Sequence, residues 1–346
     1  MTTPSNENEE VPLVDDEPDT KSRISASHDA KKIKKLLTET KVSTGKSAWA
    51  TTLETFGMSE GKRHKHDVLL VHVSVEEAIK ALQEMGKAKS WEFKYTPMDD
   101  FGANTDDIYR AFCLWAREAK EDDSVSSDTT SSSTTANYNI SKAFRRLESY
   151  ADWMDKNCSN LNLKGSTMKD IAKIWNMKLT YDKDNRAVWW IDIGALDLKK
   201  IKQEVSHDNT LRLFVWLCHL VLFDPKAQEN GFVFVQAIGK KGIYETLTCI
   251  SMDVGTKMDR LSIGVLPIKM QAFYGFHNPG WMRVAVGLIK AFMSSKMRKR
   301  MVMIPNKQNP QTALEEALGK DCIPCGITQL TGTVEKDIVE DLLEKL

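Results

Sequence analysis

Two cysteines in this chain have a spacing that could support chemistry. Cys322 and Cys325 are separated by two residues, a pattern found in thiol redox sites and in zinc sites. A zinc site needs a second pair of ligands, which the remaining cysteines do not supply, and a redox pair usually starts a helix directly after a strand. This pair instead follows the helical pattern of residues 312–319. We therefore expect both thiols to pack in the interior, and a thiol oxidoreductase is the weakest functional alternative.

His277 is the second candidate, since a histidine can act as a general base. No arrangement of a serine or cysteine nucleophile with a carboxylate is suggested around it. We therefore interpret His277 as a structural residue that ends a strand or forms a cap. The sequence thus predicts a protein that is not an enzyme, with no catalytic residue and no metal site.

Composition and charge narrow the class of protein. The chain has 346 residues, of which 41% are hydrophobic, enough to build a sizeable core. Lys plus Arg (48) equals Asp plus Glu (48), so the overall charge gives no reason to expect nucleic acid as a partner. The longest apolar run, residues 211–223, contains Arg212 and His219 and is shorter than the roughly 20 residues that span a bilayer. With a polar N-terminus and scattered cysteines, the sequence predicts a cytoplasmic protein.

Changes in composition divide the chain into four parts. Residues 1–65 are polar and acidic, and we expect them to form a disordered tail. Residues 66–160 are expected to form a helical N-terminal subdomain. Residues 161–335 are expected to form the main α/β domain, and residues 336–346 a C-terminal helix.

The N-terminal subdomain is patterned mainly as helices. A short strand starts near Asp67, and Ser74 with Glu77 has the spacing of a capping box at the start of the next helix. Apolar residues at helical spacing follow over residues 105–120 and again from residue 138. Between these two helices, residues 121–137 are a polar low-complexity segment that we expect to be a solvated loop.

The main domain alternates strands with helices. Such alternation requires crossover connections and favours a largely parallel sheet. The predicted strands are residues 186–194, 231–239, 270–278 and 300–304.

Two helices of the main domain are apolar almost all the way round. One covers about residues 208–223, and the other follows Pro279. A helix of this kind is usually buried on both sides. We therefore expect a second covering layer, or a greasy cavity or a membrane contact on one face.

The second apolar helix lies in a segment that resembles the CRAL-TRIO family of lipid-binding and lipid-transfer proteins, such as phosphatidylinositol- and tocopherol-transfer proteins. The resemblance is in register from Pro267 to Ile304: Pro-Ile-Lys-Met, Phe-Tyr, His-Asn-Pro, the apolar helix, Lys-Ala-Phe-Met, a basic stretch and a strand. Looser similarity extends over about residues 98–335. The family's usual residues are replaced at several motif positions, Ile268 and Gln236 among them, so the identity of the ligand stays open.

The resemblance implies a fold and a set of site residues. The implied fold is a helical N-terminal subdomain followed by an open mixed, largely parallel sheet with flanking helices around an apolar pocket. Residues 280–293 match the helix that closes this pocket as a mobile gate in the family. The implied pocket residues are Trp190, Phe234, Phe273, Tyr274 and Phe276. The implied gate residues are Trp281, Val284, Leu288, Ile289 and Phe292. The implied contacts with lipid head groups or a membrane are Lys290, Lys296 and Arg300.

Two hypotheses of different class follow. In the first, the protein binds one phospholipid or other hydrophobic molecule and exchanges it at membranes with anionic lipids, to which it is transiently peripheral. Its only ligand would be this lipid, with no further cofactor. In the second, the protein is a lipid-regulated adaptor that recruits a protein partner through its acidic tail and serine-rich loop.

Overall fold

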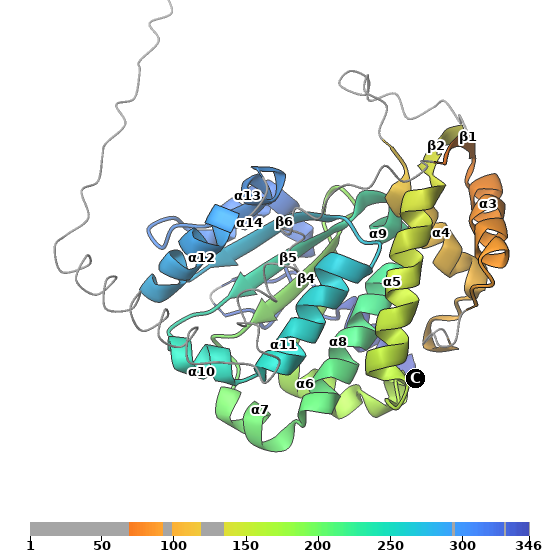
Figure 1. Ribbon diagram of the computed structural model, residues 1–346. Coiled ribbons are helices and arrows are strands. Elements are labelled where there is room, and N and C mark those ends of the chain that lie inside the picture. The colour runs from red at the N-terminus through yellow and green to blue at the C-terminus, as the bar shows by residue number, and fades with distance from the viewer. Residues whose placement is uncertain (1–68, 93–98, 119–134, 293–294, 329, 346) are drawn as a thin grey trace, which may run out of the picture.

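The computed structural model describes residues 69–92, 99–118, 135–292, 295–328 and 330–345. A sheet with helices on both faces forms the main body, and a smaller unit of helices with two short strands lies at one end of it (Figure 1). The predicted disordered tail, residues 1–65, and most of the predicted loop lie outside the described residues.

The main sheet has five strands in the order β3-β4-β5-β6-β7. Strands β4 to β7 are parallel to one another, and β3 pairs with β4 in the antiparallel direction. The fold is therefore α/β with a mixed, largely parallel sheet, as the sequence predicted. The strands are β3 (Lys178–Tyr181), β4 (Ala187–Asp192), β5 (Phe232–Ala237), β6 (Met270–Phe276) and β7 (Met301–Met303).

The sequence pattern did not predict β3. The segment between β3 and β4 is polar and resembles a loop, but its polar groups close a tight hairpin. The Asp182 carboxylate accepts hydrogen bonds from the main-chain nitrogens of Asp184 and Arg186, both at 2.9 Å, and from the Arg186 guanidinium at 2.6 Å. Asn185 takes a left-handed conformation with φ of 55°, which asparagine tolerates better than most residues. This hairpin supplies the antiparallel edge of the sheet.

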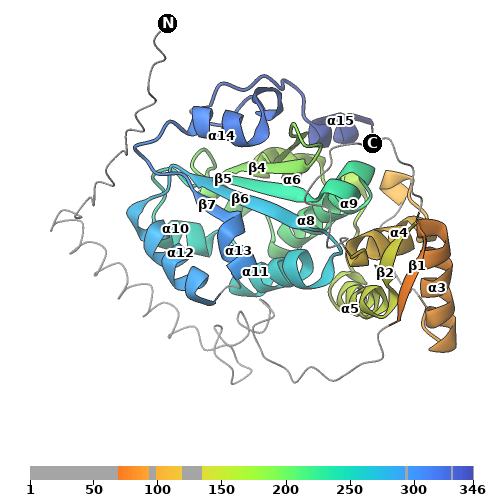
Figure 2. The same ribbon diagram turned by 90° about the horizontal axis from the view of Figure 1, so that it is seen from above.

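Helices cover both faces of the sheet. Figure 2 shows α14 and α15 on one side of the strands and α8 and α11 on the other. The helices on the second side are α6 (Lys169–Trp175), α7 (Leu198–Glu204), α8 (His207–Leu222), α9 (Pro225–Asn230), α10 (Ile243–Thr248), α11 (Met252–Asp259), α12 (Gly280–Phe292) and α13 (Ser295–Arg300). Those of the first side are α14 (Pro310–Leu318) and α15 (Ile338–Lys345). Short helical turns lie at η1 (Asp99–Phe101), η2 (Gly165–Thr167) and η4 (Lys320–Cys322), and a π-helical turn, η3 (Arg260–Val265), continues α11.

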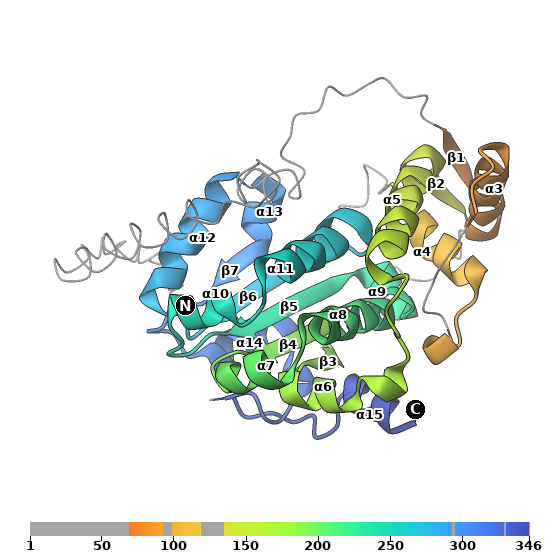
Figure 3. The ribbon, with the colours of Figure 1, turned by 60° about the horizontal axis from the view of Figure 1, so that its bottom comes forward.

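Helix α8 is buried on nearly all sides, as its apolar sequence predicted. Its start is capped by Ser206, whose hydroxyl accepts from the main-chain nitrogen of Asn209 at 3.1 Å. One face lies over the sheet, and α5 (Ile140–Cys158) covers another. Between α5 and α8, a hydrogen bond of 2.7 Å joins the Tyr150 hydroxyl to His219, whose pKa burial lowers to about 4. The second covering layer that the sequence required is thus supplied by the N-terminal unit (Figure 3).

The N-terminal unit contains β1 (Leu70–Ser74), α3 (Val75–Ala88), α4 (Thr105–Ala116), β2 (Thr135–Asn139) and α5. The capping box of α3 is confirmed: the Ser74 hydroxyl accepts from the nitrogen of Glu77 at 3.2 Å, and the Glu77 carboxylate accepts from the nitrogen of Ser74 at 3.0 Å. The prediction of a loop as far as residue 137 was wrong at its end, because β2 begins at Thr135 and pairs with β1. In this segment Ala136 and Tyr138 alternate with polar residues, and main-chain pairing with the distant strand β1 holds it in place.

The predicted C-terminal helix is α15, and a buried ion pair fixes it to the sheet. Lys178 on β3 donates to Asp337, which precedes α15, at 3.1 Å and to Glu340 on α15 at 2.8 Å. Lys178 and Asp337 are both buried. The end of the chain therefore braces the antiparallel edge of the sheet.

Candidate ligand-binding pocket

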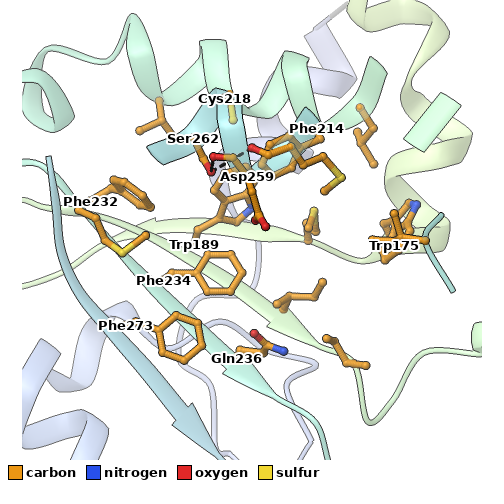
Figure 4. Close-up of a pocket in the computed structure, with 18 of the residues that line it drawn as sticks. Trp175, Trp189, Phe214, Cys218, Phe232, Phe234, Gln236, Asp259, Ser262 and Phe273 are labelled. Carbon is orange, nitrogen blue, oxygen red and sulfur yellow. Dashed lines mark hydrogen bonds between the residues drawn. The ribbon is translucent and has the colours of Figure 1, made fainter. Parts of the chain in front are cut away.

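A cavity of about 460 Å³ lies between the sheet and the helices α8, α11 and α12. This volume is in the range of small-molecule binding sites. Figure 4 shows aromatic side chains of the sheet on one side of the cavity and residues of α8 and α11 on the other. The lining is mostly apolar, so the cavity is suited to a hydrophobic ligand.

The floor of the pocket is a row of aromatic rings on neighbouring strands. Strand register places Phe234 of β5 beside Trp189 of β4 and Phe273 of β6. The rings of Phe234 and Phe273 stack with centroids 5.6 Å apart, and Trp189 stacks at 5.6 Å on Phe214 of α8. Such ring pairs contribute more stabilisation than the burial of their surface area alone, and they fix the shape of the floor.

The walls come from helices and from the ends of the strands. Helix α8 contributes Thr210, Leu213, Phe214, Cys218 and Val221; the segment of α11 and η3 contributes Met258, Asp259 and Ser262; α12 contributes Met282 and Val286. The remaining lining residues are Trp175, Met177, Ile191, Ile193, Leu198, Phe232, Gln236, Thr246, Cys249, Ile250, Leu266, Ile268, Met270, Arg300 and Met301.

Two lining residues carry a formal charge, Asp259 and Arg300. Burial raises the pKa of the Asp259 carboxyl to about 6, because surrounding protein disfavours the charged form. The guanidinium of Arg300 donates to the main-chain oxygen of Met270 and, at 3.3 Å, to the side-chain oxygen of Gln271. Arg300 is therefore held by β6, while Asp259 faces the cavity.

Of the five predicted pocket residues, Phe234 and Phe273 line the cavity. The placement of Trp190, Tyr274 and Phe276 in the pocket was wrong, because these side chains pack on the opposite face of the sheet in a core beneath α14. Successive residues of a strand point to opposite faces, and here helices cover both faces. An apolar residue on either face therefore looks alike in the sequence.

The predicted gate helix is α12, and two residues outside the predicted set bring it to the pocket. Trp281 and Val284 pack in a small separate cluster with Ile238 and Ile243 and are not among the residues that line the cavity. Met282 and Val286 line the cavity instead. The side chains of Leu288, Ile289 and Phe292 lie outside the described part of the structure.

The predicted basic contacts lie at the end of α12 and in α13. Lys290 is half-buried, and the Lys296 side chain is outside the described residues. Arg300 is half-buried and lies in the pocket lining. Its neighbours Arg298 and Lys299 are the exposed cations of this helix.

The two groups that suggested enzymatic chemistry lie outside the pocket. Cys322 is buried in the core beneath α14, and burial raises the pKa of its thiol to about 12, which disfavours a reactive thiolate. Both Cys322 and Cys325 are free thiols. His277 has a φ of 47° at the corner between β6 and α12, and its ring packs against Phe276. Among the residues that the structure describes, no group of three or more His, Cys, Asp or Glu could hold a metal ion.

Comparison with known proteins identifies the domain that contains this pocket. Residues 173–327 match the family model described as the CRAL/TRIO domain. This part of the chain belongs to the CRAL/TRIO family. The matched segment contains all five strands of the main sheet and every residue that lines the pocket. The CRAL/TRIO domain binds lipids and other hydrophobic molecules, and the apolar cavity agrees with this general function.

One solved structure has a low similarity to this chain. A solved structure titled "Crystal structure of Sfh5" is 16% identical over 78% of this chain and 88% of that chain, with a TM-score of 0.47. No curated protein sequence matches the chain. Within the described part of the chain, every helix is too short or too polar to cross a membrane.

Several pocket residues were missed by sequence reasoning, above all those of α11 and η3. The only local signal for Asp259 is an acidic residue flanked by Met258 and the apolar residues after Arg260. Phe214 and Cys218 could have been predicted as candidates. Helix α8 is apolar on all sides, so one of its faces had to contact something besides the sheet, such as a cavity. Which residues of α8 face the cavity depends on the angle at which α8 packs on the strands, and the sequence does not give this angle.

Proposed function

We propose that this CRAL/TRIO protein carries a single lipid or similar hydrophobic molecule and exchanges it at membranes. The observation that supports the proposal is the apolar cavity between the aromatic strand floor and α12, a helix at the edge of the molecule (Figure 3). A closed α12 would cover bound lipid with Met282 and Val286. An open α12 would place the same side chains against a bilayer, where the lipid chains would shield their apolar surface from water as the bound lipid does.

The anchoring of α12 supports a movement about its N-terminal end. The Trp281 indole donates to the main-chain oxygen of Lys241 at 3.1 Å, and Trp281 packs with Ile238 and Ile243 apart from the main core. The preceding corner combines the left-handed His277 with the buried Asn278. Later in the helix, Gly287 is exposed and has no neighbour within 4 Å of an added Cβ. The helix is thus held at its start by Trp281, and one side of it is open at Gly287.

The surroundings of α12 offer groups suited to an anionic membrane. Tyr244 on α10 is 61% exposed, and α10 carries the pocket residue Thr246. Arg298 and Lys299 on α13 are exposed close to the end of α12. Each basic residue near an anionic surface contributes roughly 1 kcal/mol to binding. We infer that α10, α12 and α13 together form the face that docks on the membrane.

The carrier proposal is tested by purifying the protein from cells and identifying bound lipid by mass spectrometry. One lipid per protein chain is the expected result, together with transfer of that lipid between liposomes. Protein that binds no lipid and moves none between liposomes would refute the proposal.

The membrane face is tested separately by charge reversal. Arg298→Glu with Lys299→Glu should weaken binding to anionic liposomes and slow lipid transfer, because two attractive charges become repulsive. The matched control is Lys199→Glu with Lys202→Glu on α7, which lies far from α13 in the views of Figures 1 and 3. Equal losses in both double variants would show that overall charge, and not this face, governs docking.

A further inference from the structure

Two indole groups in the wall of the pocket have no hydrogen-bond acceptor. Trp175 ends α6 and Trp189 lies on β4; they are 3% and 4% exposed, and both line the cavity (Figure 4). Neither Nε1 atom has a hydrogen-bond partner among the described residues. An indole N–H can only donate, and a buried donor without an acceptor is unfavourable. A ligand that fills the cavity can supply the missing acceptor.

Tryptophans in the solid cores of the same fold do have acceptors. Trp190, the next residue on β4, faces the core beneath α14 and donates to the Thr180 hydroxyl at 2.8 Å. Trp216 on α8 donates to the Asp100 carboxylate at 3.2 Å. Buried indoles usually find such a partner. The missing acceptors are therefore a property of the cavity.

A threonine and a glutamine add further polar groups to the lining. The buried Thr246 hydroxyl of α10 also lacks a partner in the described structure, whereas Thr248 on the same helix donates to the main-chain oxygen of Tyr244 at 2.8 Å. Gln236 lies two residues after Phe234 on β5, so its side chain is on the same face of the sheet. No hydrogen bond joins its amide to another residue that the structure describes. The amide can donate two hydrogen bonds and the hydroxyl one.

The remaining polar groups of the lining already have partners or solvent. The Thr210 and Ser262 hydroxyls donate to main-chain oxygens four residues earlier in the chain, at 3.3 and 3.0 Å. The guanidinium of Arg300 is held by the main chain of β6. Asp259 is exposed, so water can hydrate its carboxylate. The lining groups left for a ligand are therefore rich in donors and include no cation.

We propose that the pocket selects an uncharged lipid with a carbonyl oxygen, which accepts hydrogen bonds from the Gln236 amide and the Trp189 indole. This inference rests on the proposed carrier function and names the class of ligand. Strand pairing brings the two donors to neighbouring positions of the floor, because Trp189 lies opposite Phe234 and Gln236 is the next residue of β5 on that face. Trp175 and Thr246 offer the same kind of contact to a further oxygen, as an ester would have.

A carbonyl group suits this lining better than other polar groups of lipids. Its oxygen can accept two hydrogen bonds, and it needs no acceptor in return. A hydroxyl group also needs an acceptor when it is buried, and here most of the free groups donate. A phosphate would bring negative charge into an apolar cavity in which no free cation balances it.

The test compares three ligands of similar size: tridecane, methyl undecyl ketone and the corresponding secondary alcohol. The cavity of about 460 Å³ holds roughly 15 groups that each take up the space of a water molecule in the liquid, roughly 30 Å³, and these ligands have this size. Each ligand displaces the fluorescent dye Nile red from delipidated protein. The natural protein should bind the ketone more tightly than the alcohol. In Gln236→Leu and in Trp189→Phe, the affinity for the ketone relative to tridecane should fall about tenfold, because one hydrogen bond to a buried oxygen is lost.

A further variant reverses the polarity of the site. Gln236→Glu replaces the amide by a carboxylate, which accepts and does not donate. It should bind the alcohol more tightly than the ketone.

Trp190→Phe is the matched control, because it makes the same substitution on the same strand but on the opposite face of the sheet. It should leave the ratio of the ketone and tridecane affinities unchanged even if it lowers stability, since both ligands are measured on one variant. If the ligands bind but neither Gln236→Leu nor Trp189→Phe lowers this ratio, or Trp190→Phe lowers it equally, the inference is wrong while the carrier function stands. If none of the three ligands displaces the dye and no lipid copurifies, the carrier function fails as well.

Discussion

The raised pKa of the Asp259 carboxyl predicts a pH-dependent effect of one substitution on stability. In the folded protein, burial raises the pKa of Asp259 from 3.8 to about 6. The folded chain therefore binds this proton more tightly than the unfolded chain does. As the pH rises from 3.8 to 6, the free energy of unfolding falls because of this group, and above pH 6 the loss is complete. Asp259→Asn removes the titrating group, so the variant does not suffer this loss.

The size of the effect follows from the difference between the two pKa values. A difference of about 2 pKa units, at 1.36 kcal/mol each, sets an upper limit of about 3 kcal/mol. Because the carboxyl borders the cavity, where solvent screens its charge, we expect about 1 to 2 kcal/mol. No charged neighbour contributes to the raised pKa, and the other charged lining residue, Arg300, is bound to β6. The effect therefore comes from the partial loss of water around this carboxyl.

The assay is urea unfolding of the delipidated protein, followed by tryptophan fluorescence at pH 4 and pH 7. Asp259→Asn should match the natural protein at pH 4 and exceed its free energy of unfolding by about 1 to 2 kcal/mol at pH 7. All other titrating groups are common to both proteins, so they cancel in the difference. Asp253→Asn should not show a gain at pH 7, because Asp253 lies on the same helix but is exposed and paired with Lys257 at 2.7 Å. The same difference at both pH values, or a loss at pH 7, would refute the raised pKa of Asp259.

Two further substitutions test how the pocket is braced. Lys178→Met should lower the free energy of unfolding by about 3 kcal/mol, because it leaves the buried Asp337 carboxylate without its partner, whereas Lys336→Met, in an exposed ion pair, should have no measurable effect in the same urea titration. Gly231→Ala should destabilise by more than about 1 kcal/mol, because Gly231 has a φ of 81° and an added Cβ would lie 2.3 Å from the main-chain oxygen of Lys269. Gly287→Ala in α12 should instead raise stability by up to about 1 kcal/mol, since its site is open and alanine favours the helix. Equal effects of the two alanine substitutions on the thermal midpoint would contradict this reasoning.

Local sequence signals gave several elements of the fold. Alternating apolar strands and apolar helices were sufficient for the parallel part of the sheet, β4 to β7, because parallel strands are buried on both faces and are joined by crossover helices. The capping box at Ser74 gave the start of α3, since its hydrogen bonds are made within one turn. These features depend on neighbouring residues alone.

Elements held by distant partners were missed. The polar strand β2 exists because it pairs with β1, and β3 exists because a polar hairpin aligns it with β4. Each alternates polar and apolar residues over only four or five positions, with Ala136 and Tyr138 in β2 and Leu179 and Tyr181 in β3, and each borders a polar segment that favoured a loop. Their pairing partners are main-chain groups, which every residue has, so the side-chain pattern does not say which strand each one pairs with.

The pocket divides in the same way between sequence and tertiary structure. By itself the sequence determined that two helices, α8 and α12, have more apolar surface than a single sheet can cover, and its segment from Pro267 to Ile304 pointed to the family. Only the tertiary structure decided that Phe234 and Phe273 face the cavity while Trp190, Tyr274 and Phe276 face α14. It also placed Asp259 in the apolar wall and turned Arg300 onto the main chain of β6. The physical reason is that a strand buried on both faces and a helix buried all round show no polar side, so their orientation is fixed by packing between elements far apart in the chain.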